Sequence, residues 1–269
     1  MQQISRDLLL KKYTQLAKSK LNDKKQTTAT INEAIYYLTK ASNLNPDDSG
    51  LLADLIIANN YQLAFSSFID MNWLQAIASA QAVVDAKADF AGGNASALLY
   101  EAYYALGKQN YNSGLYLDAR ENLEKAEIIA WADGDNRLKI FQVQVLVGDS
   151  IGKVDDFENA VAYYQYALNA INYGEKVANR SDLLNQYQAA EQLAAAGDYR
   201  GAYDAFQNVI GAIDAIYTIS EVEVGSGVCL ALFANENLST LDAILKANDL
   251  PTNMVISFGR VLRVPSIQK

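Results

Sequence analysis

A repeat of about 42 residues, present in five copies, is the feature that most constrains this chain. Small residues recur at Ala34, Ala76, Ala119, Ala160 and Ala202. Large or apolar residues recur three positions before, four after and seven after each of them; in the fourth copy these are Phe157, Tyr164 and Ala167. Steps of three and four residues place side chains on one stripe of an α-helix. The repeat therefore predicts an array of helix pairs.

Turn signals between the copies give the bounds of the expected helices. The pairs are 5–21 with 31–44, 51–68 with 73–90, 95–110 with 116–132, 137–151 with 157–177, and 181–197 with 199–217. We expect Thr30 to cap the helix at 31–44, with Glu33 completing a capping box. In the fourth pair we expect Ala160 to be buried near Gly148 of the preceding helix.

A second column of small residues stands twelve positions before the alanines. It holds Asn22, Ala64, Gly107, Gly148 and Ala190, and the third copy reads Tyr103-x-x-Leu106-Gly107. With these residues, 5–217 resembles a tetratricopeptide repeat array. The resemblance implies a solenoid that binds a protein or peptide. The period exceeds the family's usual value of about 34 residues, and Asn22 breaks the small column, so we expect the first copy to be a degenerate cap.

The pattern changes after Tyr217. Residues 222–224 and 261–265 read as strands, and 230–235 and 240–248 read as short helices. Residues that carry this β-α-α-β order are Val222, Val224, Gly227, Leu230, Ala234, Leu241, Ile244, Ile256, Gly259, Leu262 and Val264. They resemble a LysM module. We therefore expect an all-α helical-repeat solenoid of five helix pairs at 1–217, followed by a small α+β LysM-like domain at 218–269.

The resemblance to the repeat family implies that first-helix residues at three- and four-residue steps face a concave partner site. We call this set the partner face. Its members are Tyr61, Phe65, Phe68, Glu101, Tyr104, Lys108, Tyr111, Gln142, Asp149, Tyr187 and Glu191. Aromatic rings with scattered charges suit a peptide or helix partner. The alternative is that several of these rings pack between repeats.

In the LysM family a glycan lies between the first loop and the segment before the last strand. The corresponding residues here are Gly227, Val228, Cys229, Leu230, Asn253, Met254, Val255 and Ile256. Val228 and Cys229 stand where the family has a polar Asp-Thr pair. This apolar substitution favours contact with protein over contact with sugar. We therefore expect weak or undetectable binding of N-acetylglucosamine oligomers.

Catalytic chemistry has little support in the composition. The sequence contains no His, which removes the commonest general base and the commonest metal ligand. Without a His to activate it, Cys229 is expected to be a packed thiol. The acidic pairs Asp47-Asp48 and Asp155-Asp156 stand in turns, where Asp caps helices. We expect no catalytic residue, no metal site and no cofactor.

The charge and hydropathy of the chain limit its partners. A net charge of −9 disfavours nucleic acid, which requires a basic face. No apolar run approaches the roughly 18 residues of a membrane span. The leading hypothesis is a non-enzymatic adaptor of the bacterial cell envelope. Its array would bind a protein and its LysM-like end would bind peptidoglycan or another N-acetylglucosamine polymer.

The alternative hypothesis is a purely protein–protein scaffold whose degenerate LysM-like domain no longer binds glycan. For the adaptor we expect a periplasmic or extracellular location, with a leader absent from this chain. A cytoplasmic location is the alternative.

Overall fold

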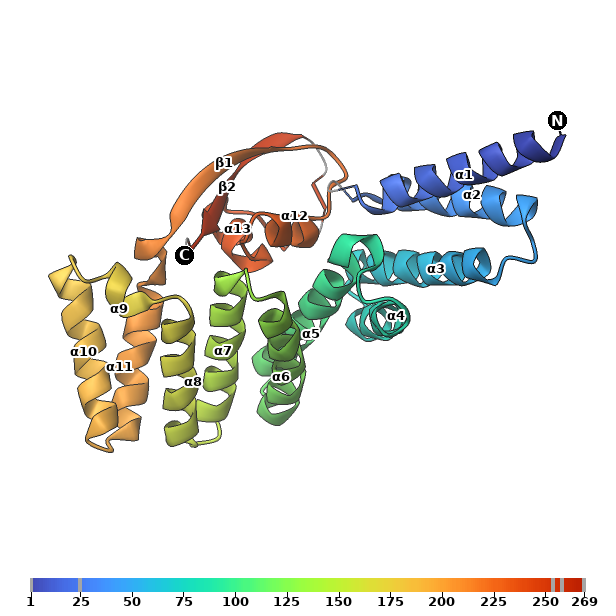
Figure 1. Cartoon of the computed structure of the whole chain (residues 1–269). Coiled ribbons are helices and arrows are strands. Elements are labelled where there is room, and N and C mark those ends of the chain that lie inside the picture. Colours follow the sequence, from blue (N-terminus) through green and yellow to red (C-terminus); the bar gives the residue numbers. More distant parts are fainter. Residues whose placement is uncertain (1, 24–25, 253–254, 257–258, 268–269) are drawn as a thin grey trace. The chain divides into compact units, whose positions relative to one another are not determined.

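The computed structural model describes residues 2–23, 26–252, 255–256 and 259–267 (Figure 1). The α-helices are α1 (Gln2–Leu21), α2 (Thr28–Leu44), α3 (Ser49–Ile69), α4 (Trp73–Ala86), α5 (Asn94–Asn112), α6 (Tyr116–Asp133), α7 (Arg137–Gly152), α8 (Phe157–Ala170), α9 (Tyr173–Lys176), α10 (Ser181–Ala195), α11 (Tyr199–Gly211), α12 (Leu230–Glu236) and α13 (Leu241–Ala247). Two 3₁₀ turns, η1 (Phe90–Gly93) and η2 (Ile213–Ile216), and two strands, β1 (Thr218–Val224) and β2 (Arg260–Ser266), complete the described elements.

Consecutive helices pack as adjacent pairs, so the predicted paired-helix architecture is confirmed. The pairs include α1 with α2, α3 with α4, α7 with α8, and α10 with α11. Figure 1 shows α7 and α8 side by side. The repeat explains this arrangement, because the five alanines of the small column are at most 1% exposed. The second helix of each pair therefore packs the face that carries this alanine against its neighbouring helices.

The contact between α7 and α8 explains why the stripe needs small residues. A Cβ atom added at Gly148 would lie 2.7 Å from Cε1 of Tyr164 and 3.2 Å from the carbonyl oxygen of Ala160. Because Gly148 has no side chain, α8 can pack closely against the backbone of α7 at this position. The expectation that Ala160 is buried near Gly148 is confirmed. Gly107 on α5 meets Leu123 and Ala119 of α6 in the same way.

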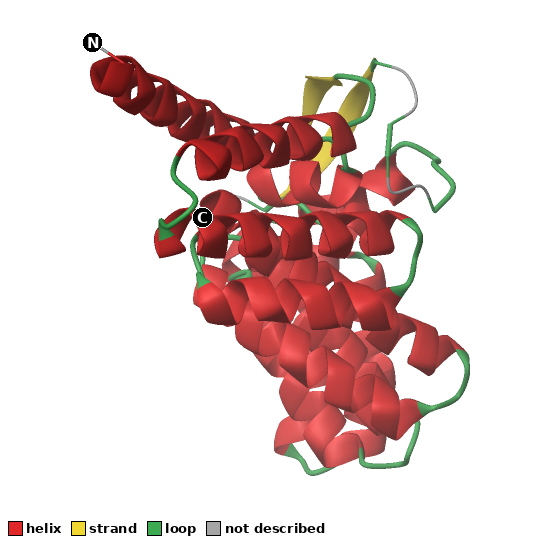
Figure 2. Cartoon of the chain, turned by 90° about the vertical axis from the view of Figure 1, so that its right-hand side faces the viewer, coloured by secondary structure: helices red, strands yellow, loops and turns green. Residues whose placement is uncertain are grey.

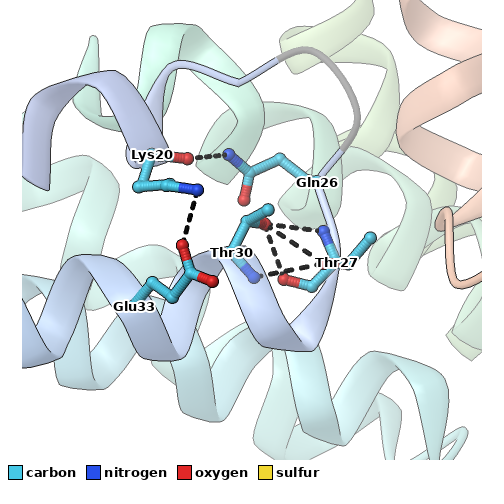
Figure 3. Close-up of polar contacts among 5 residues, drawn as sticks. All are labelled: Lys20, Gln26, Thr27, Thr30 and Glu33. Carbon is cyan, nitrogen blue, oxygen red and sulfur yellow. Dashed lines mark hydrogen bonds and ion pairs between the residues drawn. The ribbon is translucent and has the colours of Figure 1, made fainter. Parts of the chain in front are cut away.

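The start of α2 corrects one prediction. Thr27, not Thr30, is the N-cap residue: its Oγ1 accepts a hydrogen bond from the Thr30 backbone N–H at 3.1 Å (Figure 3). The Thr30 Oγ1 in turn accepts from the Thr27 N–H at 2.9 Å, which completes a capping box with Thr in both positions. Glu33 is therefore free to contact α1, where its Oε2 lies 2.5 Å from Nζ of Lys20. The helix begins three residues earlier than the repeat predicts.

Three second helices end earlier than expected, and the last of them, α11, ends at Gly211 instead of at residue 217. Helix α4 ends at Ala86, and Ala91 and Gly92 then take left-handed backbone angles, with φ of 54° and 65°. Helix α8 ends at Ala170, because Asn172 adopts a φ of 53° before the single turn of α9. Asn tolerates this conformation, but a helix does not continue through it.

Residues 218–269, which we call the C-terminal module, contain the predicted order of strand, helix, helix and strand. Strands β1 and β2 pair antiparallel in a two-stranded sheet (Figure 2). Thr240 caps α13 by accepting from the Ala243 N–H at 3.3 Å. A predominantly helical chain with a small two-stranded antiparallel sheet near its C-terminus agrees with the predicted fold class, while the solenoid and the LysM identity stay predictions.

The chain divides into two compact units. Unit 1 contains Met1–Ala102, Glu223–Glu236 and Pro251–Val261; unit 2 contains Tyr103–Val222, Asn237–Leu250 and Leu262–Lys269. The C-terminal module therefore contributes residues to both units. The expected domain boundary between 217 and 218 stays a prediction. Across the residues that the structure describes, no helix combines the length and apolar character needed to cross a membrane.

Candidate functional site

The partner-face residues of unit 1 are packed inside it. Tyr61, Phe65 and Phe68 are 0%, 1% and 1% exposed. The ring of Tyr61 meets Phe90 edge-on at 5.8 Å, and that of Phe68 meets Trp73 at 5.5 Å. Glu101 is also buried. The packing alternative therefore holds for these four partner-face residues, which form core and do not line an open surface.

The partner-face residues at the start of unit 2 contact the chain's own C-terminal module. Oδ2 of Asp242, on the first turn of α13, accepts from the Tyr104 hydroxyl at 3.2 Å and lies 2.5 Å from Nζ of Lys108. Tyr104 and Lys108 are one turn apart on α5, so both reach the same carboxylate. The pair remains partly exposed, at 44% for Lys108 and 30% for Asp242. This part of α5 binds an acidic helix end.

A buried contact holds the α12–α13 turn beside this ion pair. Nδ2 of Asn136 donates to the Ser239 carbonyl at 2.6 Å, and both residues are 0% exposed. The Oδ1 of Asn136 also caps α7 by accepting from the Lys139 N–H at 3.1 Å. One side chain thus positions a helix of the array and a segment of the C-terminal module. Asp242 and Asn136 were not among the predicted site residues, because neither belongs to a repeat column.

A tyrosine cluster surrounds Asp149 between α7, α8 and α11. Asp149 accepts a hydrogen bond from the Tyr164 hydroxyl, and the Tyr164 ring stacks on Tyr203 at 5.3 Å. Nε2 of Gln207 donates to the Tyr203 hydroxyl at 3.0 Å. Burial raises the pKa of Asp149, although the hydrogen bond from Tyr164 opposes the shift. Burial, with the nearby Asp149 carboxylate, raises the pKa of Tyr111 to about 12.

Removing the ionisable group of Asp149 is expected to change the pH dependence of stability. When folding raises the pKa of an acid, the protonated form favours the folded state. This contribution to the free energy of unfolding is complete below the ordinary pKa and is lost as pH rises through the folded-state pKa. Asp149→Asn keeps an acceptor for Tyr164 and cannot ionise. The melting temperature of this variant, relative to the parent, should therefore be higher at about pH 8 than at about pH 4. Asp47→Asn, at an exposed turn, is the control, and equal pH profiles for parent and Asp149→Asn would contradict the expectation.

The remaining partner-face residues lie on α7 and α10 and are half-buried. The Tyr187 ring meets Tyr173 at 5.6 Å and Phe206 at 6.4 Å. Burial raises the pKa of Tyr187, and its neighbour Glu191 adds to the shift. Oε2 of Glu191 accepts from Gln165 at 2.9 Å. Tyr111 with Asp149, and Tyr187 with Glu191, are thus brought together, and each of these side chains keeps only part of its surface in solvent.

The expected glycan-binding residues are paired with one another through their backbones. The Gly227 N–H donates to the Ile256 carbonyl at 2.6 Å, and the Ile256 N–H donates to the Val228 carbonyl at 3.0 Å. Cys229 forms an antiparallel bridge with Val255. Val228, Cys229 and Leu230 are 4%, 0% and 0% exposed. Asn253 and Met254 lie outside the described residues. The described part of the first loop therefore has its side chains in the interior, not along an open groove.

Gln26, just before α2, contacts the first loop of the C-terminal module within unit 1. The Cys229 N–H donates to the Gln26 carbonyl at 3.5 Å. Nε2 of Gln26 donates to the Lys20 carbonyl at 3.1 Å (Figure 3). It also donates to the Leu21 carbonyl at 2.7 Å, and so satisfies carbonyl groups at the end of α1. Burial raises the pKa of the Cys229 thiol to about 11. The expectation of a packed thiol at Cys229 is confirmed.

Comparison with known proteins adds no family or relative to these observations. No protein-family model matches the chain, and no curated protein matches it. In the part of the chain that the structure describes, no group of three or more Cys, Asp or Glu side chains is arranged to hold a metal ion.

Proposed function

We propose that this chain is a non-enzymatic interaction scaffold of the tetratricopeptide type. Its helical array binds a partner protein, and its C-terminal module packs within the chain and does not bind glycan. The observation that carries the proposal is the contact of Tyr104 and Lys108 with Asp242. A helix is already bound at a face where the repeat resemblance implies a helix or peptide ligand.

Four of the half-buried residues of the partner face are the proposed contact site for the external partner. They are Tyr111, Gln142, Tyr187 and Glu191. Tyr offers a large contact area and a polar tip at a low cost in side-chain entropy, which suits a protein interface. The packing of Tyr187 against Tyr173 and Phe206 holds its ring in place before binding, so less order has to be imposed when a partner arrives.

A glycan-binding adaptor of the cell envelope is the second candidate. The β-α-α-β order of the C-terminal module and its LysM-like residues favour it. The burial of Val228, Cys229 and Leu230 argues against it, since a buried loop offers no hydrogen-bonding edge to a sugar.

Glycan titration separates the two candidates. For the scaffold, calorimetric titration of the full chain with chitooligosaccharides should give no heat of binding, and peptidoglycan sacculi should not retain the protein. A soluble chain with an established LysM domain is the positive control for both assays. Saturable binding of chitooligosaccharides to the full chain would instead favour the adaptor.

Photo-crosslinking tests the partner face directly. A benzoylphenylalanine in place of Tyr187 should crosslink a distinct protein in extracts of the source cells. The same amino acid in place of Tyr166, which is 60% exposed on α8, is the control. The crosslinked protein, once identified and purified, should bind the full chain in solution. Equal crosslinking at both positions, or no binding by the purified candidate, would count against the proposed face.

A further inference from the structure

A pocket of about 340 Å³ opens at the surface of unit 2, and its lining includes no residue of the first loop to which the LysM resemblance assigns a glycan. It is formed by η2, the start of β1, the end of α13 and β2. Its lining includes Asp214, Tyr217, Lys246, Asp249, Arg263 and Pro265. The volume is at the small end of the range for ligand pockets, which begins at roughly 300 Å³. A ligand for this cavity is therefore small.

Two opposite charges in this cavity have no partner among the described residues. The Arg263 guanidinium and the Asp249 carboxylate make no hydrogen bond or ion pair within that part of the chain. The other lining charges are already paired, because Nζ of Lys246 contacts Oδ2 of Asp214. Both of the unpaired side chains are exposed, so one cation and one anion are open to a ligand at this pocket.

The backbone around both groups is held in place. Oδ1 of Asn248 accepts from the Arg263 N–H at 2.8 Å, and its Nδ2 donates to the Arg263 carbonyl at 2.7 Å. This side chain ties the end of α13 to the middle of β2. Asp249 follows directly and takes a left-handed φ of 50°. Both charges are therefore mounted on fixed backbone, which lowers the cost of ordering them around a ligand.

We propose that this cavity binds a small zwitterion of the amino-acid or dipeptide class. Arg263 binds the ligand carboxylate, for which its planar fork is suited, and Asp249 binds the ligand ammonium. Tyr217 and Pro265 supply the apolar wall against the ligand's carbon atoms. The proposal is independent of the scaffold function, since it uses no partner-face residue.

Other small ligands match the cavity less well. A phosphate would meet the carboxylates of Asp214 and Asp249 in the same space as its basic partners, and like charges oppose binding. A neutral sugar would desolvate Arg263 and Asp249 without neutralising either of them. A zwitterion satisfies both groups at once.

Calorimetric titration of the full chain tests this site. The probes are alanine, alanyl-alanine, alanyl-glutamate and alanyl-lysine, which separate a free amino acid from dipeptides of different side-chain charge. At least one should bind at millimolar concentration or below. Its N-acetylated and C-amidated derivatives should each bind about ten- to a hundredfold more weakly, since each loses one charged hydrogen-bond partner.

Matched variants assign the binding to the two charges. Arg263→Ala and Asp249→Asn should each weaken binding about ten- to a hundredfold, while Arg263→Lys should recover part of the loss. Arg260→Ala, at an exposed position on the same strand and outside the cavity lining, should bind like the parent. Arg263→Ala keeps the two backbone hydrogen bonds to Asn248, so its melting temperature without ligand should match the parent. Failure of all four probes, or equal binding by the blocked derivatives or by Arg263→Ala, would overturn the proposal.

Discussion

Exchanging Val228 for Asp together with Cys229 for Thr is expected to destabilise unit 1 severely. In an open LysM-like groove this change would restore the family's polar pair and strengthen sugar binding. Here Val228 and Cys229 are 4% and 0% exposed, so the new carboxylate would be buried without a cation. An uncompensated buried charge costs about 3–5 kcal/mol. That is a large part of the roughly 5–15 kcal/mol that holds a domain folded.

Urea unfolding followed by circular dichroism measures this loss. Val261→Asp is the matched control, because Val261 lies on β2, belongs to the same unit and is 59% exposed. The control should change the free energy of unfolding by about 0.5 kcal/mol or less. If the double variant is as stable as the control and binds chitooligosaccharides, the groove is accessible. The glycan-binding adaptor would then be the better-supported function.

Ala160→Leu is expected to lower the stability of unit 2 by about 1–3 kcal/mol through overpacking. Ala160 is 0% exposed. The helices are so close here that a Cβ atom added at Gly148 would lie only 3.2 Å from the Ala160 carbonyl oxygen. Leu and Ala have similar helix propensities, so the backbone preference does not offset the loss.

Chemical denaturation of the full chain checks the size of this effect. Ala189→Leu is the control, since Ala189 lies on an exposed face of α10. It adds the same side chain to a helix without a neighbour in the way. If both variants unfold at the same urea concentration as the parent, the close approach of α7 and α8 at Gly148 is incorrect.

The helical part of the fold could be predicted because its information is local and repeated. Burial of Ala34, Ala76, Ala119, Ala160 and Ala202 follows from one periodic stripe, and the starts of α4, α6, α8 and α11 fall at the expected residues. Deviations arise where a nearby side chain or backbone angle overrides the period. Thr27 caps α2, which therefore begins earlier than predicted, and the left-handed backbone of Asn172 ends α8 early.

The candidate site was harder to predict, because its neighbours are distant in sequence. Periodicity correctly puts Tyr61 and Tyr104 on first helices, but it does not say what covers them. Tyr61 is enclosed in unit 1, while the Tyr104 hydroxyl reaches Asp242 on α13. The same limit applies to Val228, whose apolar character indicated contact with protein but not which protein surface would provide it. In the structure that protein surface belongs to the chain itself, at the loop of Gln26.

The division of the C-terminal module between both units has a consequence for synthesis. Helices α1 to α4 share a unit with Glu223–Glu236 and Pro251–Val261, so this unit lacks two of its segments when α4 leaves the ribosome. All of 103–222 has to be translated first, a delay of roughly ten seconds at typical elongation rates. During that interval the nascent helices expose apolar surface that later becomes interior, and contacts so distant in sequence form slowly. The local pairs α1 with α2 and α3 with α4 can form early, but unit 1 is complete only when translation has reached Val261.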